Sequence, residues 1–449
     1  MSRPSLRKRF IGATKWALIG HVLSQLVRFA SSLVLTRLLA PDLYGVMAVG
    51  YMLITGLVMV SDIGLVGGAI RSTRGDDPTY LNVTWIVAIA RGALITLGAL
   101  ALAGALSVGA VRTWLPADSV YNDPRIPTVL AVVSLYSLIT GFESSRSIYA
   151  RRHLALERLT KIDLASQIAS TLFILAWASI SPTIWALAVG WLFNAIMKTV
   201  LTHIALPGPR SQFVWDRAAF QEIFNFGKWV FLSSTMTYLL VTGDRLLLAV
   251  YVDATTLGQY SIAVLLMRAL QAAVLKVSAS VALPALSEVA RERPDELKTI
   301  LYRIRLPLDV VCLIAAGALL FLGEPIVRYL YDPRYAPAGW MLGVVGLSLV
   351  TARLDVFERC LIAIGRVRLL SALNAVRLVA ICVLVPLGHH FAGTRGAIAG
   401  VGASFVVNGL VMLGTQARLG LLRLRYELLS APLFFCGAAA GWLLSRLLP

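Results

Sequence analysis

Charged residues are scarce in this sequence, and acidic residues are fewer than basic ones. Only 14% of the 449 residues are charged, with 23 acidic against 41 basic residues, while 58% are hydrophobic. A soluble domain carries about 25% charged residues. The mean hydropathy of +0.78 therefore excludes a soluble globular protein and indicates an integral membrane protein.

The sequence is also poor in cysteine. Its four cysteines lie far apart, inside or beside apolar stretches, at Cys312, Cys360, Cys382 and Cys436. No CxxC pair and no Cys/His cluster is present, which excludes a disulfide framework. The same absence gives no indication of a metal site or of any cofactor.

Catalytic motifs are missing as well. The chain has no GxxxxGK[ST] phosphate loop, no HExxH zinc motif and no GxSxG nucleophile elbow. Each of these patterns places reactive groups at the spacing that its chemistry requires. No loop between apolar runs is long enough for a folded catalytic domain, so we expect no catalytic residues and no enzymatic activity.

Long apolar runs are what the chain has in abundance. A bilayer core of about 30 Å needs roughly 20 apolar residues in a helix, and such runs recur with short polar breaks between them. We predict an all-α polytopic membrane protein with thirteen transmembrane helices. The predicted spans are 14–38, 44–70, 82–111, 125–150, 162–181, 184–206, 226–251, 258–287, 300–323, 338–364, 368–391, 395–419 and 429–447.

Basic residues gather on one side of these predicted spans. The tail and loops on the side of the N-terminus carry 26 Lys and Arg residues, and the opposite loops carry 7. Because basic loops are retained in the cytoplasm during insertion, the N-terminus is predicted to be cytoplasmic. Most of the net charge of +18 then reflects membrane topology and does not require a nucleic-acid partner.

Two halves of the chain begin alike when residue n is compared with residue n+213. Lys15 and Trp16 align with Lys228 and Trp229. Six predicted spans separate the two starts, so the halves would have the same membrane orientation, as in parallel-repeat transporters. The predicted parts are an N-terminal six-helix lobe (1–206), a cytoplasmic linker (207–225), a C-terminal six-helix lobe (226–419) and an extra C-terminal helix (420–449).

Charged residues inside the predicted spans need a partner or a wet cavity, because a charge at the bilayer centre costs at least about 2.5 kcal/mol. The arginines to which we assign binding of a phosphate group are Arg28, Arg91, Arg245, Arg268 and Arg377. The acids inside spans include Asp62, Asp309 and Asp355. They could bind a coupling proton or cation, or form structural ion pairs between helices.

Polar residues recur at three- and four-residue steps on the leading helix of each half. His21, Gln25 and Arg28 share one face of the first predicted span, and Tyr238 and Arg245 share a face of the seventh. This spacing predicts two polar faces along a shared cleft, where His21, Gln25 and Tyr238 would contact substrate. Small hydroxyls in these stripes could instead only pack helices together. A weaker stripe runs through Thr140, Glu143, Ser144 and Ser147.

Segments at the start of each half resemble a known family. One is the run Leu35-Thr-Arg-Leu-Leu-Ala-Pro-Asp-Leu-Tyr-Gly45, followed by Ser61-Asp-Ile-Gly64; the other is Gly243-Asp-Arg-Leu-Leu-Leu-Ala-Val-Tyr251. They resemble polysaccharide flippases of the multidrug/oligosaccharidyl-lipid/polysaccharide exporter superfamily. The resemblance implies two six-helix lobes around a central cavity that opens alternately to the two sides. It also implies transport of undecaprenyl-pyrophosphate-linked oligosaccharide across the bacterial inner membrane, for exopolysaccharide, capsule or O-antigen biosynthesis.

Three rival functions differ in the features they need. A drug/cation antiporter of the same superfamily should prefer an acidic cavity, and a membrane glycan polymerase or ligase usually needs a large outside loop. A purely structural membrane partner would not need two polar stripes. We expect a monomeric flippase whose partners are the lipid-linked oligosaccharide, membrane lipids and, in the cell, polysaccharide polymerase and export machinery.

Overall fold

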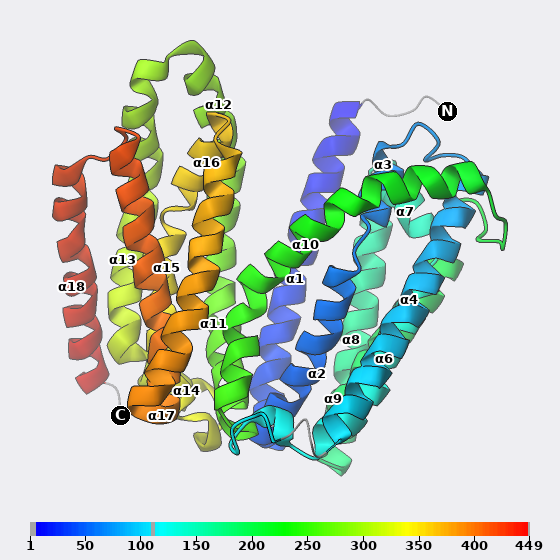
Figure 1. Ribbon diagram of the computed structural model, residues 1–449, viewed down its shortest axis with the longest axis horizontal. Helices are drawn as coiled ribbons and strands as arrows, with labels where there is room; N and C mark the ends of the chain where they lie inside the picture. The colour runs from blue at the N-terminus through cyan, green and yellow to red at the C-terminus, as the bar shows by residue number, and fades with distance from the viewer. Residues whose placement is uncertain (1–5, 109–112, 448–449) are drawn as a thin grey trace. The chain divides into compact units, whose positions relative to one another are not determined.

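The computed structural model describes residues 6–108 and 113–447, which form helices and turns without any strand. The side chains of Lys228, Trp229 and Lys276 lie outside the described residues, so the aligned pair Lys228 and Trp229 is not tested. The all-helical architecture agrees with the fold class predicted from the apolar runs (Figure 1).

The chain divides into two compact units, Met1–Val241 and Thr242–Pro449. The division falls inside α10 (Arg217–Tyr251), so the first part of this helix packs with unit 1 and the last part with unit 2. The predicted linker 207–225 ends in the first turns of α10. The lobe boundaries 1–206, 226–419 and 420–449 remain predictions.

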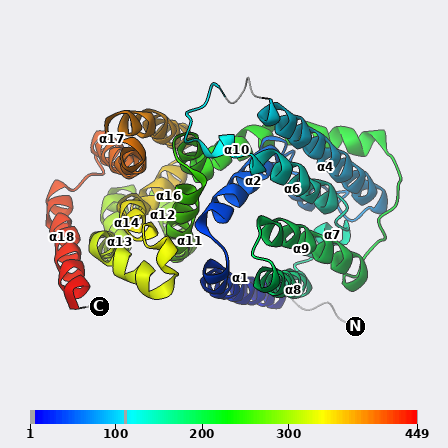
Figure 2. The ribbon, with the colours of Figure 1, turned by 90° about the horizontal axis from the view of Figure 1, so that it is seen from below.

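Unit 1 is a bundle of long helices and three short elements, α3, η1 and α7. Its elements besides α10 are α1 (Leu6–Leu38), α2 (Pro41–Val60), α3 (Leu65–Arg71), α4 (Pro78–Ser107), η1 (Val120–Asn122), α6 (Arg125–Gly141), α7 (Arg146–Arg152), α8 (Leu156–Ile180) and α9 (Ile184–Ala205). Helix α8 packs against both α1 and α9, and α6 packs against α4, α9 and α2 (Figure 2). This order leaves α2 in contact with α9 as well.

Local sequence signals explain where several of these helices begin. Pro41 and Pro78 are the first residues of α2 and α4, where a missing backbone N–H costs nothing. The Asp77 carboxylate accepts a hydrogen bond from the Thr79 backbone N–H at 2.9 Å and caps α4. The starts of these two spans are therefore fixed by residues next to them in the chain.

Unit 2 contains the remaining helices. They are α11 (Ala254–Val277), the π-helical turn η2 (Ser278–Ala282), α12 (Leu283–Glu292), η3 (Pro294–Glu296), α13 (Leu297–Leu330), η4 (Pro333–Tyr335), α14 (Ala338–Gly346), α15 (Ser348–Ala352), α16 (Asp355–Ala363), α17 (Val367–Arg418) and α18 (Leu424–Leu447). Helix α13 packs against α14 and α18, and α14 also packs against α11. Non-helical backbone at Ala392 and Gly393 divides α17 where the sequence predicts a break between two spans.

Glycines let α18 lie very close to α13. A β-carbon added to Gly437 would lie 2.2 Å from the Ile314 carbonyl oxygen, and one added to Gly317 would lie 2.0 Å from the Phe434 carbonyl oxygen. Small residues are the usual means by which helix backbones approach each other in a membrane. The C-terminal helix is therefore an integral part of unit 2.

The predicted number of thirteen spans is not confirmed. Among the described residues, nine helical segments are long and apolar enough to cross a membrane, or ten if the bent pair α6 and α7 forms one span. The nine do not include α10 and α11, although these helices overlap the predicted spans 226–251 and 258–287. The number of apolar segments nevertheless establishes a multi-pass membrane protein.

The segment between α9 and α10 is bound to unit 1. The Arg146 guanidinium donates to the carbonyl oxygens of His203 and Leu206 at the end of α9, at 2.7 and 3.1 Å. Arg74 forms an ion pair with Asp216 at 2.7 Å, and this hydrogen bond holds the pKa of Asp216 below its ordinary value of 3.8. Contacts with unit 1 therefore hold both ends of this segment, the first at the end of α9 and the second at Asp216.

Candidate functional site

Two helices of unit 1 are interrupted by polar residues. The α2 helix ends at Val60, and α3 begins at Leu65 after Gly64, which has a left-handed backbone with φ of 61°. The α6 helix ends at Gly141, and α7 begins at Arg146 with a bend of 62°. Interrupted helices free backbone polar groups, which membrane proteins tolerate where the break faces protein or a polar cavity.

A cavity of about 440 Å³ lies at these two breaks. Its charged lining residues are Asp62, Arg91, Glu143 and Arg151, so the lining carries two positive and two negative groups. Its other polar lining residues include Thr84, Thr140, Ser144, Ser145 and Ser147. The weaker stripe predicted on the sequence, from Thr140 to Ser147, therefore faces a real cavity.

Arg91 enters this cavity from α4. Its Nη2 group donates to the Val58 carbonyl oxygen in the last turn of α2, and its Nε donates to the Ser61 hydroxyl at 3.2 Å. Carbonyl groups at a helix C-terminus have no helical partner and carry partial negative charge, so a guanidinium is stabilised there. Arg91 thus stabilises the break at the end of α2 and also lines the cavity.

Asp62 connects the α2 break to α10. One carboxylate oxygen accepts from the Gly64 backbone N–H at 2.9 Å, and the other accepts from the Ser234 hydroxyl at 2.8 Å. A β-carbon added to Gly227 of α10 would lie 2.6 Å from the Ile63 side chain, so the two segments touch closely here. Asp62 therefore has structural partners and also faces the cavity.

Arg151 and Glu143 supply the other charges of the cavity. Within the described residues Arg151 forms no ion pair or side-chain hydrogen bond, so its guanidinium is available to a ligand. The Glu143 carboxylate lies 3.8 Å from the Lys198 ammonium. Guanidinium groups bind phosphate oxygens through paired hydrogen bonds, so Arg151 and Arg91 together suit a phosphorylated ligand.

The residues predicted on α1 are mostly accessible. His21 and Arg28 are exposed, and Gln25 is half-buried. The neighbouring Ser24 donates to the Gln167 side chain at 2.6 Å, which fastens α1 to α8. Roles for His21, Gln25 and Arg28 in binding remain predictions.

Tyr238 is buried, and its hydroxyl donates to the Met52 carbonyl oxygen at 2.6 Å. A β-carbon added to Gly56 would lie 3.0 Å from the Tyr238 ring, so the ring packs flat against α2. This hydrogen bond and the one from Ser234 to Asp62 hold the first part of α10 on unit 1. A contact between Tyr238 and substrate remains a prediction.

The predicted arginines of unit 2 differ in their surroundings. Arg245 on α10 is buried, and its Nε has no hydrogen-bond partner among the described residues. The Nε of Arg377 on α17 is likewise buried and unpartnered, and its guanidinium lies 5.8 Å from the centre of the Phe405 ring. Arg268 on α11 is half-buried.

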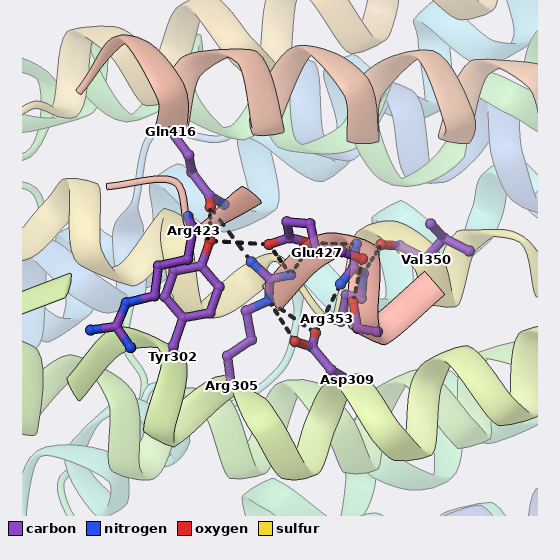
Figure 3. A network of polar contacts seen from close by, with 9 residues as sticks. Tyr302, Arg305, Asp309, Val350, Arg353, Gln416, Arg423 and Glu427 are labelled. Carbon is purple, nitrogen blue, oxygen red and sulfur yellow. Dashed lines mark hydrogen bonds and ion pairs between the residues drawn. The ribbon is translucent and has the colours of Figure 1, made fainter. Parts of the chain in front are cut away.

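Four buried charges join α13, the turn between α15 and α16, and α18 in a closed cluster (Figure 3). Asp309 accepts from Arg305 at 2.9 Å and from Arg353 at 3.2 Å. Glu427 of α18 accepts from Arg305 at 2.6 Å and from Arg353 at 3.2 Å. Each carboxylate thus bridges both arginines, which balances the charges inside the protein and gives Asp309 a structural partner.

Sequence analysis missed two members of this cluster. Arg305 lies near the start of the predicted span 300–323, where it is one of the 26 basic residues on the side of the N-terminus, whereas its side chain is completely buried in α13. Its spacing of four residues from Asp309 was a local signal, since such residues lie on one helical face. No local signal identified Glu427, which reaches the cluster from another helix.

Asp355 has a separate set of partners. Its carboxylate accepts from Ser278 in the π-helical turn at 2.6 Å and forms an ion pair with Arg359 at 3.1 Å. A π-helical turn often marks a functional site within a helix. Asp309 and Asp355 are therefore both paired, while a coupling role for either remains a prediction.

Comparisons with known proteins agree with this architecture. The family model described as "Polysaccharide biosynthesis protein" matches residues 34–339. The chain is 20% identical to the lipopolysaccharide biosynthesis protein WzxC of Escherichia coli K12, over 91% of this chain and 80% of WzxC. It is 21% identical to the succinoglycan biosynthesis transport protein ExoT of Rhizobium meliloti 1021, over 74% of this chain and 65% of ExoT. The chain thus spans less than two thirds of the length of ExoT.

Two solved structures share the fold. The lipid II flippase MurJ in an inward closed conformation matches with a TM-score of 0.66 and 12% identity, over 97% of this chain and 92% of MurJ. A multidrug resistance MATE family transporter of the MOP superfamily, in an inward-facing conformation, matches with a TM-score of 0.62 and 14% identity, over 88% and 94% of the chains. The resemblance seen at the start of each half is confirmed. Since the family model covers more than half of its length, the chain belongs to the polysaccharide biosynthesis protein family of membrane proteins.

Proposed function

We propose that this protein flips undecaprenyl-pyrophosphate-linked oligosaccharide units across the bacterial inner membrane by alternating access, for surface polysaccharide biosynthesis. The names of its relatives support this proposal, since WzxC is a lipopolysaccharide biosynthesis protein and ExoT a succinoglycan biosynthesis transport protein. The fold shared with the lipid II flippase MurJ supports the same mechanism.

The cavity at the two helix breaks is the observation that carries the proposal. It places Arg91 and the unpaired Arg151 on one polar surface inside a membrane protein of the polysaccharide biosynthesis family. Two guanidinium groups suit the two phosphates of a pyrophosphate, whereas a neutral glycan alone would not need them. The sequence also predicts phosphate contacts for Arg28, Arg245, Arg268 and Arg377, and these contacts stay predictions.

Transport would start with the headgroup entering from the cytoplasmic side, while the lipid tail stays in the bilayer. The protein would act as a monomer with its N-terminus in the cytoplasm, without enzymatic activity, and would supply substrate to polysaccharide polymerase and export machinery. A proton or cation gradient would drive the cycle through an acid in the span region. Of the predicted acids, Asp62 is the best placed, because it lines the cavity.

A drug/cation antiporter is the second candidate, because the MATE transporter shares the fold with a TM-score of 0.62. An antiporter for cationic drugs should have a cavity with net negative lining. The charged lining of this cavity is balanced, with Asp62 and Glu143 against Arg91 and Arg151. The lining therefore lacks the net negative charge that an antiporter should have, which leaves the antiporter as the weaker candidate.

Deletion of the gene in a strain without paralogues tests the proposed function. We expect lipid-linked oligosaccharide to accumulate facing the cytoplasm, and the intact gene should restore export. Purified protein in proteoliposomes should move the same lipid to the opposite leaflet, where an added membrane-impermeant glycosidase cleaves its sugar. Normal export in the deletion strain, together with no movement in proteoliposomes, would refute the proposal.

A further inference from the structure

Three aromatic rings from three helices of unit 1 lie against one another. The Trp191 ring of α9 stacks on the Tyr136 ring of α6 with 4.2 Å between ring centres and 18° between planes. The Tyr51 ring of α2 lies 5.2 Å from the Trp191 ring. Tyr51 is 46% exposed, so the three rings form a supported platform with an accessible end.

Three charged side chains from neighbouring elements form a second cluster beside these rings. The Lys198 ammonium on α9 lies 3.1 Å from the Asp163 carboxylate on α8 and 3.8 Å from the Glu143 carboxylate. Lys198 follows the platform residue Trp191 by seven residues on α9, which is about two helical turns. The charged cluster and the platform therefore lie along the same face of α9.

This surface is unsuited to contact with lipid tails. The Asp163 side chain is 48% exposed although α8 is apolar enough to span the membrane. Asp163 lies at the start of the predicted span 162–181, where a carboxylate borders water and is accessible to a polar ligand. Helix packing alone does not account for an exposed aromatic ring beside exposed hydrogen-bonding groups.

Glu143 connects this surface to the arginine-containing cavity. Its side chain lines the cavity at the α6 break, and its carboxylate also lies beside Lys198. A ligand with a phosphate group on Arg91 or Arg151 that extends past Glu143 meets Lys198 and Asp163 next. This arrangement suits a headgroup whose phosphate is joined to sugars.

We propose that Tyr51, Trp191 and Asp163 form a sugar-binding subsite for the glycan of the lipid-linked substrate. A pyranose ring lays its C–H face on the Tyr51 ring, because the negative face of an aromatic ring attracts polarised C–H groups. Asp163 accepts hydrogen bonds from sugar hydroxyls, and Lys198 donates to sugar oxygens. Tyr136 and Trp191 support the Tyr51 ring. This inference rests on the proposed function. It assigns the sugars of the substrate to the subsite, whereas the cavity holds the phosphates.

Binding to two carrier lipids separates the sugar contact from the phosphate contact. The full-length protein in nanodiscs is titrated with undecaprenyl pyrophosphate and with undecaprenyl-pyrophosphate-linked oligosaccharide extracted from the producing strain, and bound lipid is measured by native mass spectrometry. We expect Tyr51→Ala and Asp163→Asn each to weaken binding of the sugar-bearing lipid about tenfold. Both variants should bind the sugar-free lipid like the wild type, which also shows that they are folded.

Matched controls make the outcome specific. Tyr51→Phe keeps the ring and should retain affinity, and Tyr329→Ala, at a tyrosine of unit 2 that is 88% exposed, should change neither affinity. Unchanged binding of the sugar-bearing lipid to Tyr51→Ala, or equal weakening for both lipids, would overturn the subsite while the proposed function stands. A wild-type protein that binds neither lipid would overturn the proposed function and this inference with it.

Discussion

The side chains of Arg305 and Glu427 form a buried ion pair, with 2.6 Å between the guanidinium and the carboxylate. The pair joins α13 to the C-terminal helix α18, and Arg353 and Asp309 complete its charge balance. Removing one partner of a buried ion pair leaves the other charge unpaired, at a cost of about 3–5 kcal/mol. This carboxylate therefore contributes to the attachment of α18 to α13.

We expect Glu427→Ala to lower the free energy of unfolding by about 3 kcal/mol or more, because two buried arginines lose a counter-charge. Thermal unfolding of the purified protein in detergent measures the effect. Glu324→Ala is the matched control, since Glu324 pairs with Arg328 at the surface and should contribute less than about 1 kcal/mol. Equal melting temperatures for the two variants would contradict a stabilising role of the buried cluster.

Gly437→Ala should also loosen α18, because the added β-carbon would meet the Ile314 carbonyl oxygen at 2.2 Å. Gly414→Ala is the control, since nothing lies within 4 Å of its added β-carbon. Alanine favours a helix by up to about 1 kcal/mol over glycine, so the control should be neutral or slightly more stable. A melting temperature unchanged by Gly437→Ala would argue against close α13–α18 packing.

Arg151 and Arg91 should differ when each is replaced by glutamine. Both variants should lose at least about tenfold in transport, because each loses a charge-assisted contact with phosphate. Only Arg91→Gln should also lower the melting temperature, since Arg91 supports the end of α2 and Arg151 has no partner among the described residues. Transport in proteoliposomes and thermal unfolding provide the two readouts.

The control for these variants is Arg158→Gln, at an exposed arginine of α8 outside the cavity lining. It should leave transport and stability unchanged. Wild-type transport by Arg151→Gln would show that the cavity does not hold the phosphates.

The predicted acids should separate into a coupling and a structural class. We expect Asp62→Asn to transport without response to a collapsed ion gradient, because Asp62 faces the cavity and asparagine can still accept from Ser234. Asp309→Asn should instead lower the melting temperature, because Asp309 is fully buried between two arginines. Persistence of gradient dependence in Asp62→Asn would remove Asp62 from the coupling mechanism.

The connection between α9 and α10 should become sensitive to protease when Asp216 is replaced. Asp216→Asn breaks the ion pair with Arg74, so cleavage within residues 207–216 should become faster at neutral pH. In the wild type, the hydrogen bond from Arg74 lowers the pKa of Asp216 below 3.8, so the anchoring is present above that pH. The anchoring of the connection is lost as the pH falls through the lowered pKa of Asp216.

Limited proteolysis followed by mass spectrometry measures the cleavage at each pH. Glu157→Gln serves as the control, because its ion pair with Lys161 is exposed and lies within one helix. Equal cleavage rates in Asp216→Asn and the wild type would show that Asp216 does not hold the connection.

The sequence by itself determined the class of this protein. The apolar runs, the helix starts at Pro41 and Pro78, and the family resemblance at the start of each half are properties of residues that are neighbours in the sequence. They can therefore be recognised without the structure. The sequence also identified Asp62 and Arg91 as charges that need partners, since a charge in a membrane span is costly wherever it lies. Such properties follow from composition and periodicity along one helix.

Only the tertiary structure decided which partner each charge has. Asp309 meets Glu427 across 118 positions of sequence through Arg305 and Arg353, and Asp62 meets Ser234 across 172. Tyr51, Tyr136 and Trp191 come from three helices, so no periodicity along the chain relates them. Ion pairing and ring stacking act over a few ångströms in space, whereas sequence patterns report neighbours along the chain, so the sites emerge only when the helices pack.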